Sequence, residues 1–329
     1  MIRIGIIGGS RIAPGHAQAI RNLGNSCELI AVASSSAERA RSIAEPHGAE
    51  AVVDWRTLLV RTDIDAVVVA TPNPQHVEMG TAALRAGKHL LIEKPMAMTL
   101  AECDGLIQVA QDQRRKLFVG HTQHFFSTNQ AARALLSSGE LGSLVTFTDT
   151  WYKPFGVAVR RPWFLDRSTG GGMWFMNGAH MVDRALWFND SKVTTVKAWI
   201  GNPLLGLKAD DTNIAVLQHA NGKLSTLVHA GYEVGDERWH GEFVCTKGMM
   251  RLSTFPPGAG LWTAKDASGY APVKVEEREA LTQQMDAFVN CIDKDLPETI
   301  APIHARHVMA VLLAAEESSR TGRETSVGP

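Results

Sequence analysis

The stretch of sequence that decides the fold is residues 2–13, IRIGIIGGSRIA. Ile2–Ile7 is an apolar run typical of a β-strand, and a helical pattern begins at Pro14 and continues to Leu23. The two glycines between them allow the chain to turn tightly. The stretch therefore predicts a strand, a glycine turn and a helix, which together form the first unit of a nucleotide-binding α/β fold.

The turn also carries a dinucleotide-binding pattern. Gly8, Ser10 and Ala13 stand at the spacing G-x-G-x-x-G/A. Gly8 permits the turn and Ala13 lets the helix pack closely on the strand, but Ser10 departs from the pattern where the backbone approaches the pyrophosphate. The position between a strand and a helix favours phosphate binding at the helix N-terminus over a plain strand-to-helix turn. We expect the nucleotide to contact Gly8, Ser10, Arg11 and Ile12.

The end of the second predicted strand bears on the choice of cofactor. NAD-preferring folds usually place Asp or Glu about 20 residues beyond the glycines, whereas this chain has Ser34, Ser35 and Ser36 there. The hydroxyls carry no charge that would repel a 2′-phosphate, and Arg39 or Arg11 could bind one. The pattern favours NADP over NAD, with Ser34, Ser35 and Arg39 as contacts. The alternative is that the serines only cap the following helix.

Short Val- and Ile-rich runs alternate with helical patterns over residues 1–121. Further strands are expected at Leu29–Ala33, Asp65–Ala70, His89–Ile92 and Leu117–Gly120. Helices are expected at Ala37–Ala44, Asp54–Leu59, Pro74–Ala86 and from about Leu100 to Arg115, where Thr99 and Glu102 fit a capping box. Strands that alternate with helices predict a doubly wound parallel sheet.

The pattern changes in residues 122–329, which we interpret as a second domain. Ten aromatic residues fall within 147–188, against two within 1–120. A helix is expected at Gly171–Phe188, and hairpins are expected around Asn221-Gly222 and Lys247-Gly248, which predicts an open, mainly antiparallel sheet. The tail, residues 276–320, returns to helix, broken near its prolines, and could pack back on the first domain.

Composition excludes several classes of function. The 329 residues carry 33 Lys plus Arg and 34 Asp plus Glu, so no basic excess points to nucleic acid. No apolar stretch reaches the roughly 18 residues of a membrane helix, and the N-terminal run is too short for a signal peptide. The four cysteines are too far apart in sequence for a zinc or CxxC motif. We expect a cytoplasmic protein with no membrane or nucleic-acid partner.

Four further motifs follow in order along the chain. They are ATPNPQH at 70–76, AGKHLLIEKP at 86–95, VGH at 119–121 and GGGMWFMNGAHMVD at 170–183. Together with the glycine turn they resemble the Gfo/Idh/MocA family of NAD(P)-dependent oxidoreductases, over essentially the whole chain. The resemblance implies a Rossmann domain followed by a C-terminal α+β domain, whose open sheet commonly forms a homodimer or homotetramer.

The resemblance also implies roles for individual residues. The motif lysine and histidine of the family correspond to Lys94 and His180. The Lys94–Pro95 peptide is often cis in relatives. The residues implied to line the nicotinamide half of the cofactor are Thr71, Pro72, Asn73, His76, Glu93 and Lys94 itself.

These residue types suit the oxidation of a secondary alcohol. His180 can take the proton because an imidazole titrates near neutrality, and such a base typically contributes about 10²–10⁴-fold. Lys94 can stabilise the alkoxide at the same reacting carbon. Many relatives carry Asp four residues before the motif histidine, but Met176 stands there in this chain. Asn177 could hold a substrate hydroxyl instead, since helical spacing places Asn177, His180 and Arg184 on one face.

Polar residues before this helix are candidates for the substrate rim. They are Tyr152, Lys153, Arg160, Arg161 and Trp163. Clustered cations would suit a carboxylate or phosphate on the substrate, although a solvated loop explains them equally well. His121 is a further candidate for the substrate side. His121 and His124 have H-x-x-H spacing, but no third ligand is evident, so no metal site is expected.

Three functions remain open at this stage. The first is hydride transfer between nicotinamide and a ring alcohol or ketone of a sugar, inositol or similar polyol. The second is a dehydrogenase of a carboxylated aromatic cis-dihydrodiol, as in phthalate breakdown, which the arginines and aromatics would suit. The third is a non-catalytic NAD(P)-binding sensor, which would tolerate the loss of Lys94 or His180, although both are present.

Overall fold

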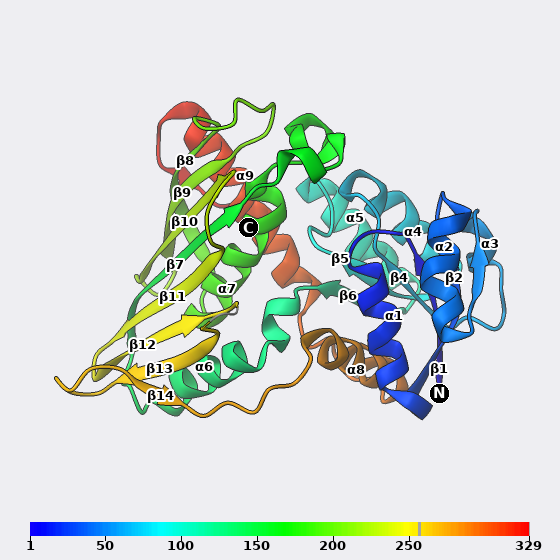
Figure 1. Cartoon of the computed structure of the whole chain (residues 1–329), viewed down its shortest axis with the longest axis horizontal. Coiled ribbons are helices and arrows are strands. Elements are labelled where there is room, and N and C mark those ends of the chain that lie inside the picture. The colour runs from blue at the N-terminus through cyan, green and yellow to red at the C-terminus, as the bar shows by residue number, and fades with distance from the viewer. Residues whose placement is uncertain (256–257, 329) are drawn as a thin grey trace. The chain divides into compact units, whose positions relative to one another are not determined.

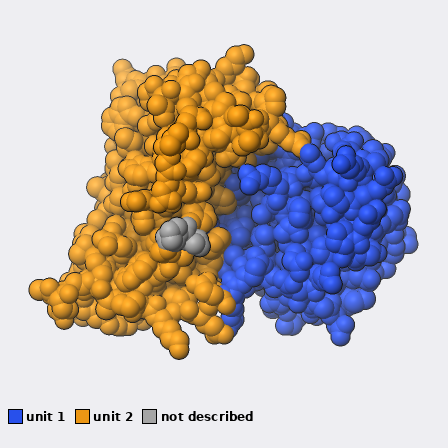
Figure 2. Space-filling model, viewed as in Figure 1, with its two compact units in different colours: residues 1–125, 278–306 blue, residues 126–277, 307–329 orange. Residues whose placement is uncertain are grey.

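The computed structural model describes residues 1–255 and 258–328. The chain divides into two compact units, which are distinguished in Figure 2. Unit 1 contains residues 1–125 and 278–306, and unit 2 contains residues 126–277 and 307–329. The tail of the second predicted domain, residues 276–320, therefore supplies residues to both units.

Unit 1 is built on a six-stranded sheet in the order β3-β2-β1-β4-β5-β6, and every neighbouring pair is parallel (Figure 1). The strands are β1 Ile2–Ile7, β2 Cys27–Ala33, β3 Glu50–Val52, β4 Ala66–Val69, β5 His89–Glu93 and β6 Leu117–Gly120. This confirms the doubly wound sheet. The sequence analysis missed β3, which is only three residues long and only partly buried, so it has no hydrophobic period to detect.

The helices of unit 1 follow the predicted order. They are α1 Ala13–Asn22, α2 Ala37–Ala44, α3 Arg56–Leu59, α4 His76–Arg85, α5 Leu100–Asp112 and, from the tail, α8 Ala280–Asp293. The predicted capping box is present, since Thr99 Oγ1 accepts from the Glu102 amide at 3.2 Å and the Glu102 carboxylate accepts from the Thr99 amide at 2.9 Å. Met285 and Phe288 of α8 share a buried core with β1 and α1.

Unit 2 contains a nine-stranded sheet in the order β14-β13-β12-β11-β7-β10-β9-β8-β15. The strands are β7 Leu144–Pro154, β8 Val193–Gly201, β9 Thr212–His219, β10 Leu224–Tyr232, β11 Arg238–Cys245, β12 Gly248–Ser253, β13 Gly260–Ala264, β14 Ala271–Val273 and β15 Thr325–Ser326. The β10–β7 pair is parallel and the other pairs are antiparallel, which confirms the expected mainly antiparallel sheet. Both expected hairpins form, β9–β10 and β11–β12.

Three helices accompany this sheet. They are α6 Ser127–Ser138, α7 Ala179–Asn189 and α9 Pro302–Thr321, whose first residues, up to Arg306, belong to unit 1. Figure 1 shows α6 and α7 against the same face of the sheet, where they contact β12, β13, β7 and β10. The expected helix at Gly171–Phe188 is corrected. A turn of π-helix at Trp174–Gly178 precedes α7, and Gly172 has a left-handed φ of 99° that an α-helix does not allow. Within the described residues, we find no helix with the length and apolar character needed to cross a membrane.

Candidate active site

The glycine turn of unit 1 has no room for a side chain. Gly8 has φ 124°, and a Cβ there would lie 2.2 Å from the carbonyl oxygen of Ala70. Ser10 follows, and its buried Oγ has no hydrogen-bond partner in the described part of the chain. Thr71, just beyond β4, has a buried Oγ1 that also makes no hydrogen bond to the described residues. The strand order reverses between β1 and β4, which is where α/β sheets of this kind bind nucleotides.

The side chains at the end of β2 gather around the second glycine of the turn. A Cβ on Gly9 would lie 2.3 Å from Cδ of Arg39 and 2.7 Å from Oγ of Ser34. The Arg39 guanidinium donates to the Gly9 carbonyl at 3.3 Å. Ser36 caps α2 by accepting from the Arg39 amide, so the capping explanation holds for this serine. Ser35 and Arg11 are exposed.

His76 joins two segments of backbone at the carboxyl edge of the sheet. Its ring is fully buried, with Nδ1 2.9 Å from the carbonyl oxygen of Pro95 and Nε2 2.9 Å from that of Thr71. Burial lowers the pKa of His76, while the two carbonyls oppose that shift. A neutral imidazole has one N–H, so His76 donates to one of these carbonyls and only contacts the other. The ring thus packs against both segments, the one that carries Thr71 and the one that carries Lys94. Asn73 is buried as well.

Glu93 ends β5 and is paired inside unit 1. Its Oε1 lies 2.8 Å from Nε2 of His16, whose side chain is wholly buried on α1. Burial alone would raise the pKa of Glu93, but the hydrogen bond and charge of His16, together with the charge of Lys94, lower it. Glu93 is therefore a buried carboxylate. Lys94 follows it, half-buried, and its peptide bond to Pro95 is cis.

His180 lies in the first turn of α7 in unit 2 and is half-buried. Its ring centroid lies 6.5 Å from that of Trp151 and 6.3 Å from that of Trp239, and these two indoles stack on each other at 3.9 Å. Asn177, in the π-helical turn, is also half-buried. Its Nδ2 lies 3.1 Å from Nε2 of His229, a buried residue of β10.

Arg184 does not share the exposure of Asn177 and His180. Its side chain is fully buried, with Nη2 3.5 Å from Oδ1 of the equally buried Asp149 and the guanidinium 4.5 Å from the centroid of Trp239. Burial raises the pKa of Asp149 to about 6, although the Arg184 charge favours the ionised form. His180 and Arg184 both lie within the regular helix α7, four residues apart, and both approach the ring of Trp239, but only Arg184 is fully buried. The π-helical turn at residues 174–178 changes the helical period only on the Asn177 side of these two residues.

The residues expected at the substrate rim belong to unit 2, with one exception. Tyr152 and Arg161 are exposed, and Trp163 is half-buried. Lys153 places Nζ 3.4 Å from Glu237 and 4.7 Å from the ring centroid of Trp151. Arg160 donates to the Phe155 carbonyl at 2.9 Å and lies over Phe164.

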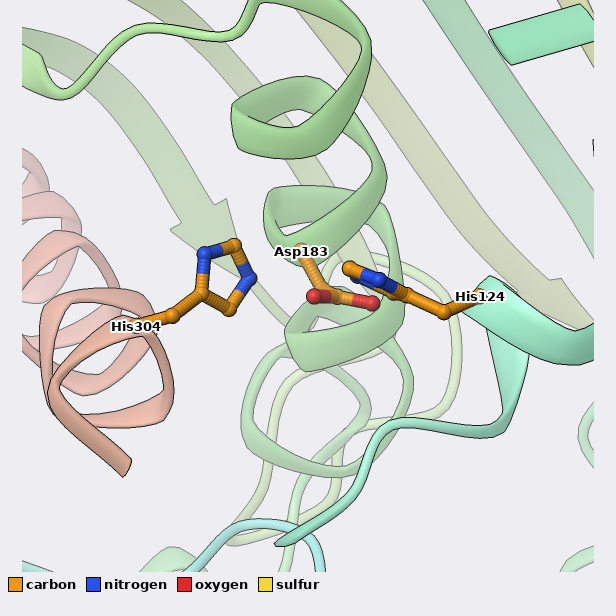
Figure 3. A group of neighbouring side chains, drawn as sticks. All are labelled: His124, Asp183 and His304. Atoms are coloured by element: carbon orange, nitrogen blue, oxygen red, sulfur yellow. The ribbon is translucent and has the colours of Figure 1, made fainter. Parts of the chain in front are cut away.

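The exception is His121, which is buried in unit 1. The rings of His121 and His124 each meet that of His304 edge to face, at centroid distances of 5.9 and 5.5 Å. Figure 3 draws and labels the side chains of His124, His304 and Asp183, the last of which belongs to α7. Such ring spacing is ordinary for packed aromatic side chains. The expectation of no metal site remains a prediction.

Two family models match the chain. The model described as the oxidoreductase family with an NAD-binding Rossmann fold matches residues 2–121, and that of the GFO/IDH/MocA C-terminal domain matches residues 129–251. This chain belongs to the Gfo/Idh/MocA oxidoreductase family. Unit 1 is accordingly an NAD(P)-binding Rossmann fold.

Two relatives with similar sequences are named for ring compounds as their substrates. The inositol 2-dehydrogenase of Rhizobium meliloti is 30% identical over 95% of this chain and 94% of its own. The 1-carboxy-3-chloro-3,4-dihydroxycyclohexa-1,5-diene dehydrogenase of Comamonas testosteroni is 30% identical over 54% of this chain, and this match spans about half of that enzyme, 45%. An oxidoreductase domain protein from Kribbella flavida has the same fold, with a TM-score of 0.90, 22% identity and coverage of 100% and 99%.

The Gfo/Idh/MocA motifs indicated Lys94 and His180, but the sequence analysis missed three residues that contact the candidate site residues Arg39, Glu93 and Asn177. Gly9 occupies a variable position of the glycine motif, and only the packing of Arg39 shows why it must be small. His16 occupies an interior position of α1 among the buried residues Ala13, Ala17 and Ile20. A polar residue on this apolar helix face was the signal in the sequence. His229 lies on a strand whose register against Trp151 is not visible in the sequence.

Proposed function

We propose that this chain transfers a hydride between nicotinamide and a ring secondary alcohol or ketone of a small polyhydroxylated substrate, such as a sugar or an inositol. The match to an inositol 2-dehydrogenase along nearly the full length of both chains carries this proposal. The glycine turn and the buried hydroxyls of Ser10 and Thr71 fit a dinucleotide, because each would gain a polar partner when it binds. Bound nicotinamide supplies the hydride acceptor or donor.

In this proposal His180 and Lys94 share the work at the reacting carbon. His180 removes the hydroxyl proton during oxidation and returns it during reduction. Lys94 lies near the forming alkoxide, and at roughly 3 Å with an effective dielectric of about 20 the attraction is worth about 5 kcal/mol before desolvation. Its position directly after β5 supports this role, since ligands of doubly wound sheets bind beyond the carboxyl ends of the strands.

We infer a preference for NADP over NAD from the side chains around the turn. Arg39 is held against Gly9 by a hydrogen bond, and Ser34 is packed at the same place. Neither side chain is an acid that would bind ribose hydroxyls and repel a 2′-phosphate. The guanidinium offers further donors for that phosphate.

A second candidate substrate is a carboxylated ring cis-dihydrodiol. The similarity to the Comamonas testosteroni enzyme favours it, since the substrate for which that enzyme is named carries both a carboxylate and a ring diol. Arg161 is exposed, and Lys153 and Arg160 lie on the same segment of unit 2. Paired hydrogen bonds from such cations would hold a carboxylate.

One experiment separates these functions. Purified protein is assayed with NAD and with NADP against a panel of cyclic polyols, aldoses and ring-dihydrodiol carboxylates, with nicotinamide reduction as the signal. Turnover of polyols supports the first function, and turnover confined to the carboxylated diols supports the second. Tight nucleotide binding without turnover of any member would support a sensor and contradict both enzymes.

We also infer that the chain forms a homodimer or homotetramer through the sheet of unit 2. Trp199 pairs with Ile214 and Val244 pairs with Met249, so the members of each pair lie on the same face. All four side chains are exposed, as is Leu224. Exposed apolar faces of this kind commonly form interfaces between copies. Sedimentation analysis of the wild type and of Trp199→Glu tests this, because a monomeric wild type would contradict it.

The proposed setting is the cytoplasm, without a nucleic-acid or membrane partner. All four cysteines are buried free thiols, which suits a reducing compartment.

A further inference from the structure

A short chain of hydrogen bonds in unit 2 runs from a backbone carbonyl to the amide of Asn177. His229 places Nδ1 2.7 Å from the carbonyl oxygen of Trp151, its neighbour in the parallel register of β10 and β7. On its other side, Nε2 lies 3.1 Å from Nδ2 of Asn177. The His229 side chain is fully buried and stacks on the Trp151 ring, with centroids 5.0 Å apart.

The chemistry of these groups leaves one arrangement of protons. A backbone carbonyl can only accept, so Nδ1 of His229 carries the hydrogen. Burial lowers the pKa of His229 to about 3, and the nearby charge of Lys153 acts in the same direction, so the ring is neutral. A neutral imidazole has one N–H, hence Nε2 accepts. The Asn177 group that faces it must then be the NH₂, which donates.

This arrangement fixes which end of the amide is available. Oδ1 of Asn177 and its second N–H make no hydrogen bond to the described residues, and the side chain is only half-buried. Asn177 also precedes His180 by three residues, at the junction of the π-helical turn and α7. An oxygen acceptor beside one N–H matches a hydroxyl group, which both donates and accepts. A carboxylate has lone pairs only and cannot use the acceptor.

We propose that His229 is a positioning residue that holds the Asn177 amide with Oδ1 presented to a substrate hydroxyl, so that this subsite selects a hydroxyl and rejects a carboxylate. The inference rests on the proposed function, because it assigns the substrate group that Asn177 binds. Asn177 lies about one helical turn before His180. It also applies to the second candidate substrate, whose ring diol rather than its carboxylate would be bound here.

The proton arrangement can be measured without any turnover. Nitrogen-15 NMR of histidine-labelled protein distinguishes a protonated ring nitrogen from an unprotonated one, and His229→Gln assigns the signal. We expect Nδ1 protonated and Nε2 unprotonated throughout pH 6–9. A protonated Nε2, in either the neutral or the charged ring, would turn the amide around and overturn the inference even if the protein is an active dehydrogenase.

Substrate discrimination gives the second test. With the polyol that is turned over best, the ratio of kcat/KM between the polyol and each of its deoxy analogues is measured. We expect the wild type to prefer the hydroxyl at one ring position by roughly tenfold to hundredfold. Asn177→Ala and His229→Leu should each abolish that preference, and the double variant should show no greater loss of preference than either single variant. His229→Gln should retain part of the preference, because its amide can both donate and accept.

His219 provides the matched control. It too is buried, with ring nitrogens 3.1 Å from the Ser191 carbonyl and 2.9 Å from Ser225 Oγ, but it lies on β9 and does not contact Asn177. His219→Leu should lower stability without changing the preference. If His229→Leu keeps the wild-type preference, or His219→Leu loses it equally, the positioning role is wrong. If wild type turns over no polyol, the proposed function fails, and the NMR result alone decides the orientation of the amide.

Discussion

Nε2 of His16 lies 2.8 Å from Oε1 of Glu93, and this buried contact joins α1 to the end of β5 one residue before Lys94. The helix that follows the glycine turn is thereby tied to the segment that carries the proposed catalytic lysine. The cofactor turn and the lysine both adjoin one packed core, since β1, α1 and Leu91 of β5 share buried apolar contacts.

Replacing His16 should reveal the free energy that it costs to bury the ionised carboxylate of Glu93 without a partner. We expect His16→Phe to lower the free energy of unfolding by about 3–5 kcal/mol at pH 7.5, because Glu93 keeps its burial but loses its partner. In the wild type the lowered pKa of Glu93 adds stability that is present above its unfolded pKa, near 4.3, and is lost as pH falls through the folded pKa. In the variant, burial raises the pKa of Glu93, so the deficit should shrink between pH 7.5 and pH 4.5.

Urea unfolding at the two pH values measures the effect. His47→Phe serves as control, because His47 is half-buried and has no carboxylate in contact. A deficit for His16→Phe that is small, or that does not depend on pH, would show that Glu93 is not held as an ion.

The position of Arg39 predicts cofactor selectivity. Arg39→Ala should lower kcat/KM for NADP by roughly tenfold or more and leave that for NAD within about twofold, since a charged hydrogen bond to phosphate is worth about 1.5–3 kcal/mol. Arg41→Ala, an exposed change on the same helix α2, should affect neither cofactor. Equal losses with both cofactors would mean that Arg39 only packs on Gly9.

The glycine turn predicts a steric result. Gly8→Ala should abolish measurable nucleotide binding, because the new Cβ would meet the Ala70 carbonyl and φ at this position is positive. Gly105→Ala lies in α5, where nothing stands within 4 Å of the new Cβ, and should raise stability by about 0.5–1 kcal/mol. Nucleotide fluorescence titration and thermal unfolding report the two effects. Normal binding by Gly8→Ala would refute the proposed cradle.

The buried pair of Arg184 and Asp149 predicts a second pH dependence. The pKa of Asp149 is raised to about 6, so the stability that this group contributes is present below its unfolded pKa, near 3.9, and is lost as pH rises through about 6. Arg184→Leu removes the cation that opposes this shift and should cost about 3–5 kcal/mol at pH 7.5 and less at pH 5. Adding Asp149→Asn should recover part of the loss, as measured by urea unfolding. A double variant no more stable than Arg184→Leu would show that lost packing, and not the stranded charge, causes the effect.

The sequence was informative where local chemistry decides the structure. The alternation of strands and helices predicted the sheet of unit 1, Thr99 and Glu102 predicted a capping box, and Asn221-Gly222 predicted a hairpin. Failures came where tertiary packing decides. The helix expected from Gly171 begins instead with a π-helical turn followed by α7, and Arg184 is buried against Asp149 rather than half-buried like Asn177 and His180. His16 and His229 act through partners 77 and 52 residues away, which no local pattern records.

The central claim is that Lys94 and His180 act on the same reacting carbon. The most direct measurement is kcat for Lys94→Met, His180→Gln and the double variant, with NAD(P)H binding followed by fluorescence. Each single variant should lose at least about 10²-fold while it still binds nucleotide, and the double variant should be within a few-fold of the weaker single variant, because the two groups stabilise one transition state. Near-normal turnover in either single variant, or a double loss equal to the product of the two, would contradict the claim.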